Sequence, residues 1–165
     1  MNKSLSALAI ASIALLAAAG AQAEGVRTER NMSLELANRI ATAAVASCLD
    51  KGYAVTTTVV DRAGTVRAVM RADNAGPHTV DASRAKAYTS ASAKNTTLAM
   101  MENAQKNPAA ATLVYLPGML LVGGGVPVKV GNEVIGAVGI GGAPGGHLDE
   151  QCAVAAIATV ADLLK

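Results

Sequence analysis

Two pairs of β-rich segments joined by short turns constrain the fold of this chain more than any other feature. The first pair surrounds Asp61-Arg62-Ala63-Gly64, and the second surrounds the two-residue turn Gly131-Asn132. Strands connected by turns this short pair antiparallel. A further short apolar segment precedes the triple glycine Gly123-Gly124-Gly125. The predicted strands cover residues 54–60, 65–71, 119–122, 126–130 and 133–140.

Four helical segments flank and separate these strands. Ser33 is typical of a helix start, Lys51-Gly52 of a helix end, and Asp149 and Glu150 favour the positive first turn of a helix. The predicted helices cover residues 33–51, 79–93 and 96–105, and a last helix begins at His147 or Asp149 and ends near residue 164. This order of elements predicts one α+β domain, in which helices cover a mostly antiparallel sheet, and it contains no internal repeat.

Residues 1–23 are predicted to be a signal peptide. Lys3 precedes an apolar run over residues 5–19, and Ala21-Gln22-Ala23 matches a signal-peptidase cleavage site. The run is shorter than the roughly 20 residues that span a bilayer, and an uncleaved anchor is the alternative. We therefore expect a periplasmic or secreted domain over residues 24–165, with no membrane attachment after cleavage.

Charge and aromatic content argue against two classes of partner. The formal net charge is +2 and no basic cluster stands out, whereas nucleic acids and anionic membranes need such a cluster. Aromatic residues make up only 2% of the chain, which leaves little for a base-stacking platform. The expected partner is therefore a small molecule and not a nucleic acid.

Two cysteines and two histidines are candidates for specific chemistry. Cys48 and Cys152 are compatible with one disulfide in an exported protein or with two separate buried thiols. His78 and His147 each lie in a loop before a predicted helix, where an imidazole can bind iron or zinc or can be a plain surface residue. Because the sequence has no HExxH or CxxC motif, a dedicated zinc site is not predicted.

Glycine runs and nearby charges form a candidate anion site. The glycine runs lack the Gly-Lys-Ser/Thr ending of a phosphate loop. Their backbone N–H groups could bind a carboxylate or another anion, or the glycines could serve only tight turns and close packing. The nearby charged side chains either face an anionic ligand or form ordinary ion pairs. The residues assigned to the ligand under this hypothesis are Arg71, Asp73, His78, Lys86, Gly124, Gly125, Gly142 and His147.

Five segments occur in the order found in one known family. They are VVDRAG (59–64), RADNA (71–75), KAYTS (86–90), GGGVP (123–127) and GNEVIGAVG (131–139). Together with Asp149-Glu150, they resemble the GlcG/HbpS-like proteins, a family often labelled heme-binding. The segments around His78 and His147 are similar to the exported branch of that family.

The resemblance implies a profilin-like fold, which is a five-stranded antiparallel sheet flanked by helices, and a homo-oligomer. In that arrangement the first and last helices lie side by side, which implies a disulfide between Cys48 and Cys152. Some relatives bind heme, and others are encoded with glycolate or diol metabolism. The resemblance thus implies an exported heme-binding protein, with His78 or His147 on the iron and Arg71 or Lys86 near the propionates.

Two alternative functions follow from the same residues. The first is an enzyme or accessory protein acting on a small anionic metabolite, with Asp73 or His78 as acid or base and the glycine loops around the anion. The second is a structural or sensory oligomer without a ligand, for which an Ala-rich surface would suit subunit packing.

Overall fold

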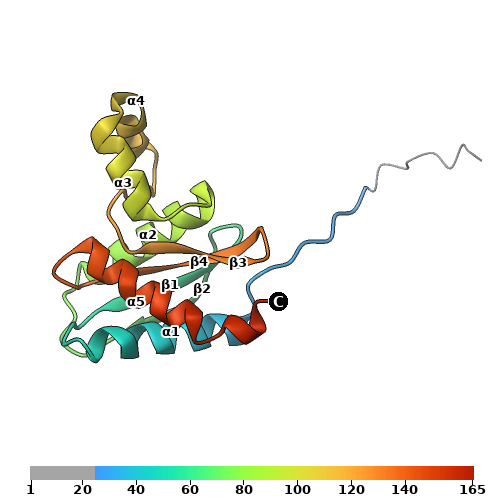
Figure 1. The fold of residues 1–165 in the computed structure, drawn as a ribbon, viewed down its shortest axis with the longest axis horizontal. Coiled ribbons are helices and arrows are strands. Elements are labelled where there is room, and N and C mark those ends of the chain that lie inside the picture. The colour runs from blue at the N-terminus through green and yellow to red at the C-terminus, as the bar shows by residue number, and fades with distance from the viewer. Residues whose placement is uncertain (1–24) are drawn as a thin grey trace, which may run out of the picture.

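The sheet at the centre of the protein has four antiparallel strands, with helices on both of its faces (Figure 1). The structure is a computed structural model that describes residues 25–165, so the predicted signal peptide lies outside the described residues. The strands are β1 (Thr56–Asp61), β2 (Val66–Arg71), β3 (Gly125–Val130) and β4 (Glu133–Gly141). Their spatial order is β2-β1-β4-β3, and every neighbouring pair is antiparallel. The two predicted hairpins and the α+β class are confirmed.

The prediction of a fifth strand at residues 119–122 is wrong. This segment joins no ladder, because its backbone bonds to a helix and not to a strand: the N–H of Leu120 donates to Thr89 Oγ1 at 2.8 Å. Pairing with β4 begins only at Gly125, which lies opposite Gly139. Short apolar runs do not distinguish a strand from an extended loop that packs on a helix.

Helices α1 (Leu34–Leu49) and α5 (Gly146–Ala158) cover one face of the sheet and pack against each other (Figure 1). Ser33 starts α1, because its side chain accepts a hydrogen bond from the N–H of Leu36 at 3.1 Å. The main hydrophobic core lies in this layer and is formed largely by alanines of the helices and by branched residues of the strands. Its fully buried members include Ile40, Ala44, Val59, Val138 and Ala153.

The last helix is shorter than predicted. Helix α5 ends at Ala158 instead of near Leu164, and a short 3-10 helix, η2 (Ala161–Leu163), follows it. Among the described residues, no helix is both long enough and apolar enough to cross a membrane.

A disulfide between Cys48 and Cys152 joins α1 to α5, which confirms the pairing implied by the family resemblance. The two Cα atoms are 5.5 Å apart, and both residues are fully buried. The alternative of two separate thiols is therefore wrong. The bond closes a loop between residues 104 positions apart, and loops of this length gain the most from crosslinking of the unfolded chain.

Helix α2 (Thr79–Ala93) covers the opposite face at unusually short distance. Gly125 and Gly139 are register partners in β3 and β4, and a Cβ on either one would collide with the α2 backbone at Lys86 or Ser83. Hydroxyl pairs hold this layer together. Thr56 bonds to Thr79 at 2.6 Å, and Thr58 bonds to Ser83 at 2.8 Å.

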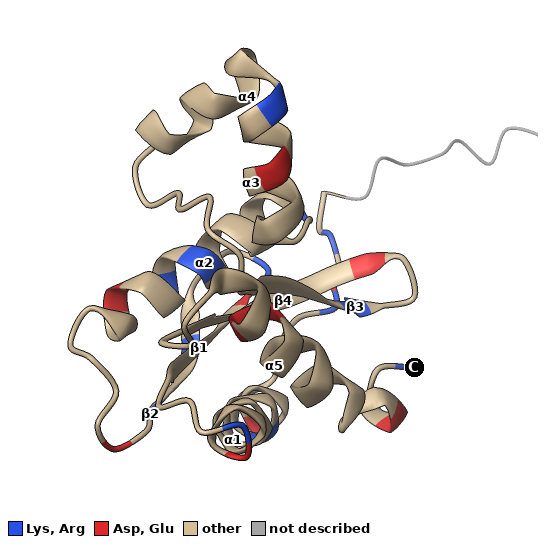
Figure 2. Cartoon of the chain, turned by 60° about the vertical axis from the view of Figure 1, so that its left-hand side comes forward, with Lys and Arg blue, Asp and Glu red and all other residues tan. Residues whose placement is uncertain are grey.

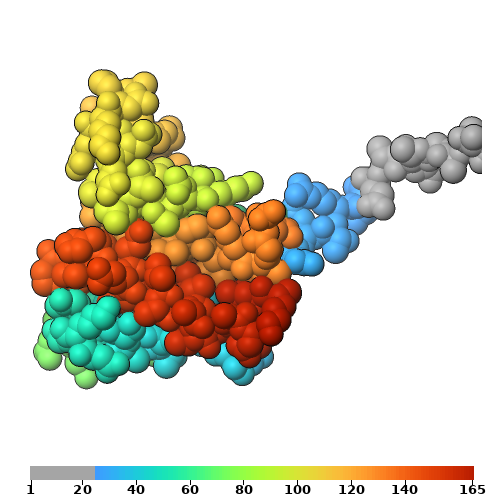
Figure 3. Space-filling view, in the orientation of Figure 1, coloured from blue at the N-terminus to red at the C-terminus, as the bar shows by residue number. Residues whose placement is uncertain are grey.

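An arm of short helices stands out from the body on the α2 side (Figures 1 and 3). It consists of α3 (Thr97–Lys106), α4 (Pro108–Ala111) and the 3-10 helix η1 (Thr112–Tyr115). The side chains of Thr96 and Asn107 cap the first two of these helices. Three apolar residues beyond them are exposed: Val114, Tyr115 and Leu116.

Replacing Gly139 by Ala should destabilise the protein by about 3 kcal/mol, because the new methyl group meets the α2 backbone, which cannot move aside as a flexible side chain would. Urea unfolding of the purified variant measures the loss. Gly25→Ala is the control, since a Cβ there meets nothing within 4 Å. Equal stability of the two variants would contradict the close approach of α2.

Replacing both Cys48 and Cys152 by Ala should lower the free energy of unfolding by about 4 kcal/mol, as expected for a loop of this length on the chain-entropy argument. The measurement is urea unfolding of the double variant beside oxidised wild type. Reduced wild type is the control and should show a similar loss. An unchanged unfolding midpoint in the double variant would show that the crosslink does not limit the unfolded chain.

Candidate functional site

A cavity of about 360 Å³ opens at the end of the sheet, between α2 and the loop that leads into α5. We call it the Lys86 cavity. His78 stands directly before α2 at its rim, and Lys86 comes from the middle of the same helix. Its lining residues are His78, Ala82, Lys86, Leu120, Val122, Gly141–Gly146 and Asp149.

A buried ion pair forms the polar floor of the Lys86 cavity. Lys86 Nζ lies 2.7 Å from Asp149 Oδ2 and donates a second hydrogen bond to the carbonyl oxygen of Ile140 at 2.8 Å. Asp149 Oδ1 accepts a hydrogen bond from the N–H of Ala143 at 3.0 Å. Both charged side chains are almost fully buried. The pair therefore connects α2, the end of β4, α5 and the loop over residues 142–145, which we call the cavity loop. Figure 2 shows α2 and α5 on either side of β4.

Gly124 makes room for this ion pair. A Cβ at Gly124 would lie 3.0 Å from Lys86 Nζ and 2.7 Å from the Cβ of Asp149, and its φ of +120° also favours glycine. Gly125 is likewise buried, and its N–H donates to Thr97 Oγ1 at 2.8 Å. Gly124 and Gly125 thus support the cavity from beneath, while Gly142 lines it.

Burial raises the pKa of Asp149 above its ordinary value of 3.8. The charge of Lys86 and the hydrogen bonds from Lys86 and Ala143 act in the opposite direction but do not outweigh the loss of hydration. A carboxyl group with a raised pKa at the floor of a cavity is a common feature of functional sites, although structural ion pairs also shift pKa values.

The structure brings only some of the predicted ligand residues together. His78, Lys86 and Gly142 share the cavity, whereas Arg71, Asp73 and His147 are not among its lining residues. Arg71 and Asp73 are exposed near the sheet edge, where the Arg71 guanidinium donates to the carbonyl oxygen of Ala75.

His147 lines a different groove, between α3 and α5, of about 390 Å³. Leu98, Glu150 and Val154 contribute to the walls of that groove. The separation arises because His147 and Asp149 are two positions apart on a helix, where such neighbours do not share a face.

Sequence reasoning missed the contribution of Asp149, Leu120 and Val122. The sequence predicts a helix start at Asp149 and includes Asp149 in the family pattern, but it does not place this residue in the ligand site. The available signal is weak: Lys86 lies in a helix of mostly small residues that also holds Asp81 and Arg84, and only if the lysine is buried does its ammonium group need an acidic partner.

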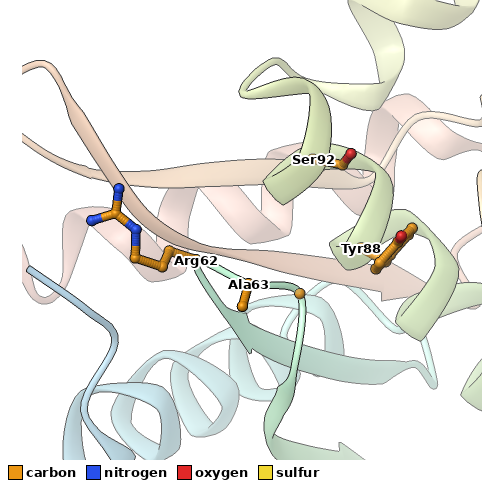
Figure 4. A pocket seen from close by; sticks show the side chains of 5 residues that line it. Arg62, Ala63, Tyr88 and Ser92 are labelled. Carbon is orange, nitrogen blue, oxygen red and sulfur yellow. The ribbon is translucent and has the colours of Figure 1, made fainter. Parts of the chain in front are cut away.

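A smaller hollow of about 160 Å³ lies on the other side of α2, beside the turn between β1 and β2. Figure 4 shows Tyr88 and Ser92 on α2 across from Arg62 and Ala63. The Arg62 side chain is occupied by ion pairs with Glu29 and Glu133, at 3.0 and 2.7 Å. Arg62 also lowers the pKa of Glu133 through this contact. The hollow therefore presents no free charge for a ligand.

The fold and the cavity define an α+β protein whose antiparallel sheet ends in a small cavity with a buried ion pair on its floor. The family model described as "Haem degrading protein HbpS-like" matches residues 32–158. The chain therefore belongs to the HbpS-like family.

Three relatives illustrate the similarity. Protein GlcG of Escherichia coli strain K12 is 32% identical over 115 residues, which cover 70% of this chain and 84% of GlcG. A double mutant of Streptomyces reticuli HbpS is 34% identical with a TM-score of 0.79, over 85% of this chain and 94% of that one. The structure of a PduOC:heme complex has a TM-score of 0.69 over 78% of this chain and 94% of PduOC; its 23% identity supports the fold alone.

Replacing Lys86 by Met should lower the free energy of unfolding by about 3–5 kcal/mol at neutral pH, because it leaves Asp149 buried without its partner. Loss of Lys86 also raises the pKa of Asp149 further. The ionised carboxylate then costs more in the folded than in the unfolded state, so stability falls as the pH rises above 3.8.

Urea unfolding at about pH 4 and about pH 7 measures both effects, and the deficit of the variant should be larger at the higher pH. Lys129→Met is the control, because Lys129 is exposed. Adding Asp149→Asn to the Lys86→Met variant should restore part of the loss. A deficit that is larger at the lower pH would contradict the assignment.

Proposed function

We propose that this protein is an exported small-ligand-binding protein whose ligand is heme, held at the Lys86 cavity, where His78 would bind the iron. The observation that carries the proposal is the position of His78. Its imidazole is exposed at the rim of a cavity, and its side chain makes no capping hydrogen bond to α2. Membership of a family described as haem-degrading supports the choice of ligand.

The residues of the cavity fit this ligand in their chemistry. A neutral imidazole is a preferred donor to heme iron, and Leu120 and Val122 add apolar surface near His78. Cavities that hold small molecules are usually about 300–1,000 Å³, and this one is near the lower limit.

His78 would hold the iron, and the apolar residues would exclude water from the covered part of the ring. Lys86 does not fit the predicted role of a free cation for propionates, because Asp149 already pairs with it. Its role under this proposal is to fix the cavity loop through Asp149 and Ala143. When bound, heme supplies a redox-active iron centre.

Export and self-assembly complete the proposal. The leader over residues 1–23 and the disulfide between Cys48 and Cys152 both support a periplasmic or secreted location, since structural disulfides persist in oxidising compartments. The exposed apolar residues Val114, Tyr115 and Leu116 on the arm support a homo-oligomer, because exposed apolar patches often mark contact surfaces.

Replacing His78 by Ala should abolish the shift of the Soret band that we expect when hemin is added to the wild-type protein, because the iron would lose its imidazole ligand. His147→Ala is the matched control and should bind as wild type does, since His147 lies in the other groove. An unchanged Soret band with wild-type protein would refute heme binding. Loss of the shift only in the His147 variant would move the site to the groove between α3 and α5.

A further inference from the structure

We infer that Lys86 is a reactive amine that forms a reversible imine with a small neutral aldehyde entering the Lys86 cavity. The inference goes beyond heme binding and does not depend on it, because it uses only the floor of the cavity. Lys86 is the one lysine among residues 25–165 whose side chain is buried and lines a cavity. The other lysines of this part of the chain are exposed: Lys51, Lys94, Lys106, Lys129 and Lys165.

The hydrogen bonds of Lys86 leave its nitrogen available to a guest. An ammonium group carries three N–H donors. Asp149 Oδ2 and the carbonyl oxygen of Ile140 accept two of them, at 2.7 and 2.8 Å. The third N–H has no acceptor among the hydrogen bonds of the described residues. The Lys86 side chain, which carries this nitrogen, lines the cavity. A carbonyl oxygen entering the cavity can therefore accept the third N–H and come within reach of the nitrogen.

Asp149 is placed to take the proton that Lys86 must lose before it can act as a nucleophile. A general base has to lie within about 2.6–3.2 Å of the proton donor, and the observed separation of 2.7 Å meets this requirement. The neutral amine adds to the carbonyl carbon to give a carbinolamine. The protonated Asp149 then returns its proton to the hydroxyl group of the carbinolamine, which leaves as water, and the nitrogen keeps its own hydrogen in a protonated imine beside the Asp149 carboxylate. The step converts the ammonium group and the aldehyde to a protonated imine and water, with no oxidant or reductant.

The surroundings of Lys86 select the class of guest. Asp149 lies beside the nitrogen, so an anionic oxo acid would meet a like charge, whereas a neutral aldehyde would not. The walls near the floor are formed mainly by small residues, including Ala82, Gly141 and Gly142, and the cavity of about 360 Å³ is open to solvent at His78. These features favour a short, unbranched aldehyde.

The experiment incubates the full-length protein with propionaldehyde and sodium cyanoborohydride at neutral pH, which reduces any imine to a stable secondary amine. Peptide mapping by mass spectrometry then measures the modified fraction of each lysine. Lys86 should reach half-modification at an aldehyde concentration about tenfold lower than any exposed lysine. Modification of Lys86 equal to or below that of the exposed lysines would overturn the inference, and this outcome needs no variant.

Two variants sharpen the test. Lys86→Arg keeps the positive charge and should remove the sensitive site, while Lys129→Arg should leave it unchanged. Asp149→Asn removes the base and should reduce labelling of Lys86 to the level of the exposed lysines; circular dichroism confirms that each variant is folded. Hemin titration of the wild-type protein separates the two proposals. Selective labelling of Lys86 without a Soret shift would refute heme binding alone. A Soret shift without selective labelling of Lys86 would refute the imine alone.

Discussion

The buried ion pair between Lys86 and Asp149 joins the two helical layers of the protein at one end of the sheet. Each charge is costly to bury alone, so each fixes the position of the other. Through Ile140 and Ala143, the pair also fixes the end of β4 and the loop that walls the cavity. The arrangement of the candidate site is therefore a consequence of satisfying two buried charges.

This pairing is possible only because α2 lies so close to the sheet. The absence of side chains at Gly125 and Gly139 lets the α2 backbone approach the strands, and the absence of one at Gly124 leaves space for the ammonium group. On the opposite face, the disulfide between Cys48 and Cys152 anchors α5 one turn beyond Asp149. The glycines and the crosslink thus position the lysine and the aspartate from different sides of the sheet.

The cavity combines two kinds of chemistry at different depths. His78 offers an imidazole at the rim, and the ion pair at the floor offers an amine next to a base. Both proposed ligands would enter the cavity that His78, Lys86 and Asp149 line. The proposed heme and a small aldehyde would therefore compete for the same cavity, even though each is recognised by different atoms.

The sequence by itself determined the two hairpins, the main helices and the α+β class, because turn residues and apolar spacing are local properties of the chain. Its resemblance to a known family also implied the disulfide between Cys48 and Cys152. The prediction of a fifth strand over residues 119–122 is wrong because the backbone of Leu120 bonds to α2, a partner that local pattern does not reveal. Tertiary structure alone decided that His78 and Lys86 share a cavity and that Arg71, Asp73 and His147 do not. It also placed Asp149 beside Lys86, 63 positions away in the chain, because which buried charges meet depends on how the layers pack.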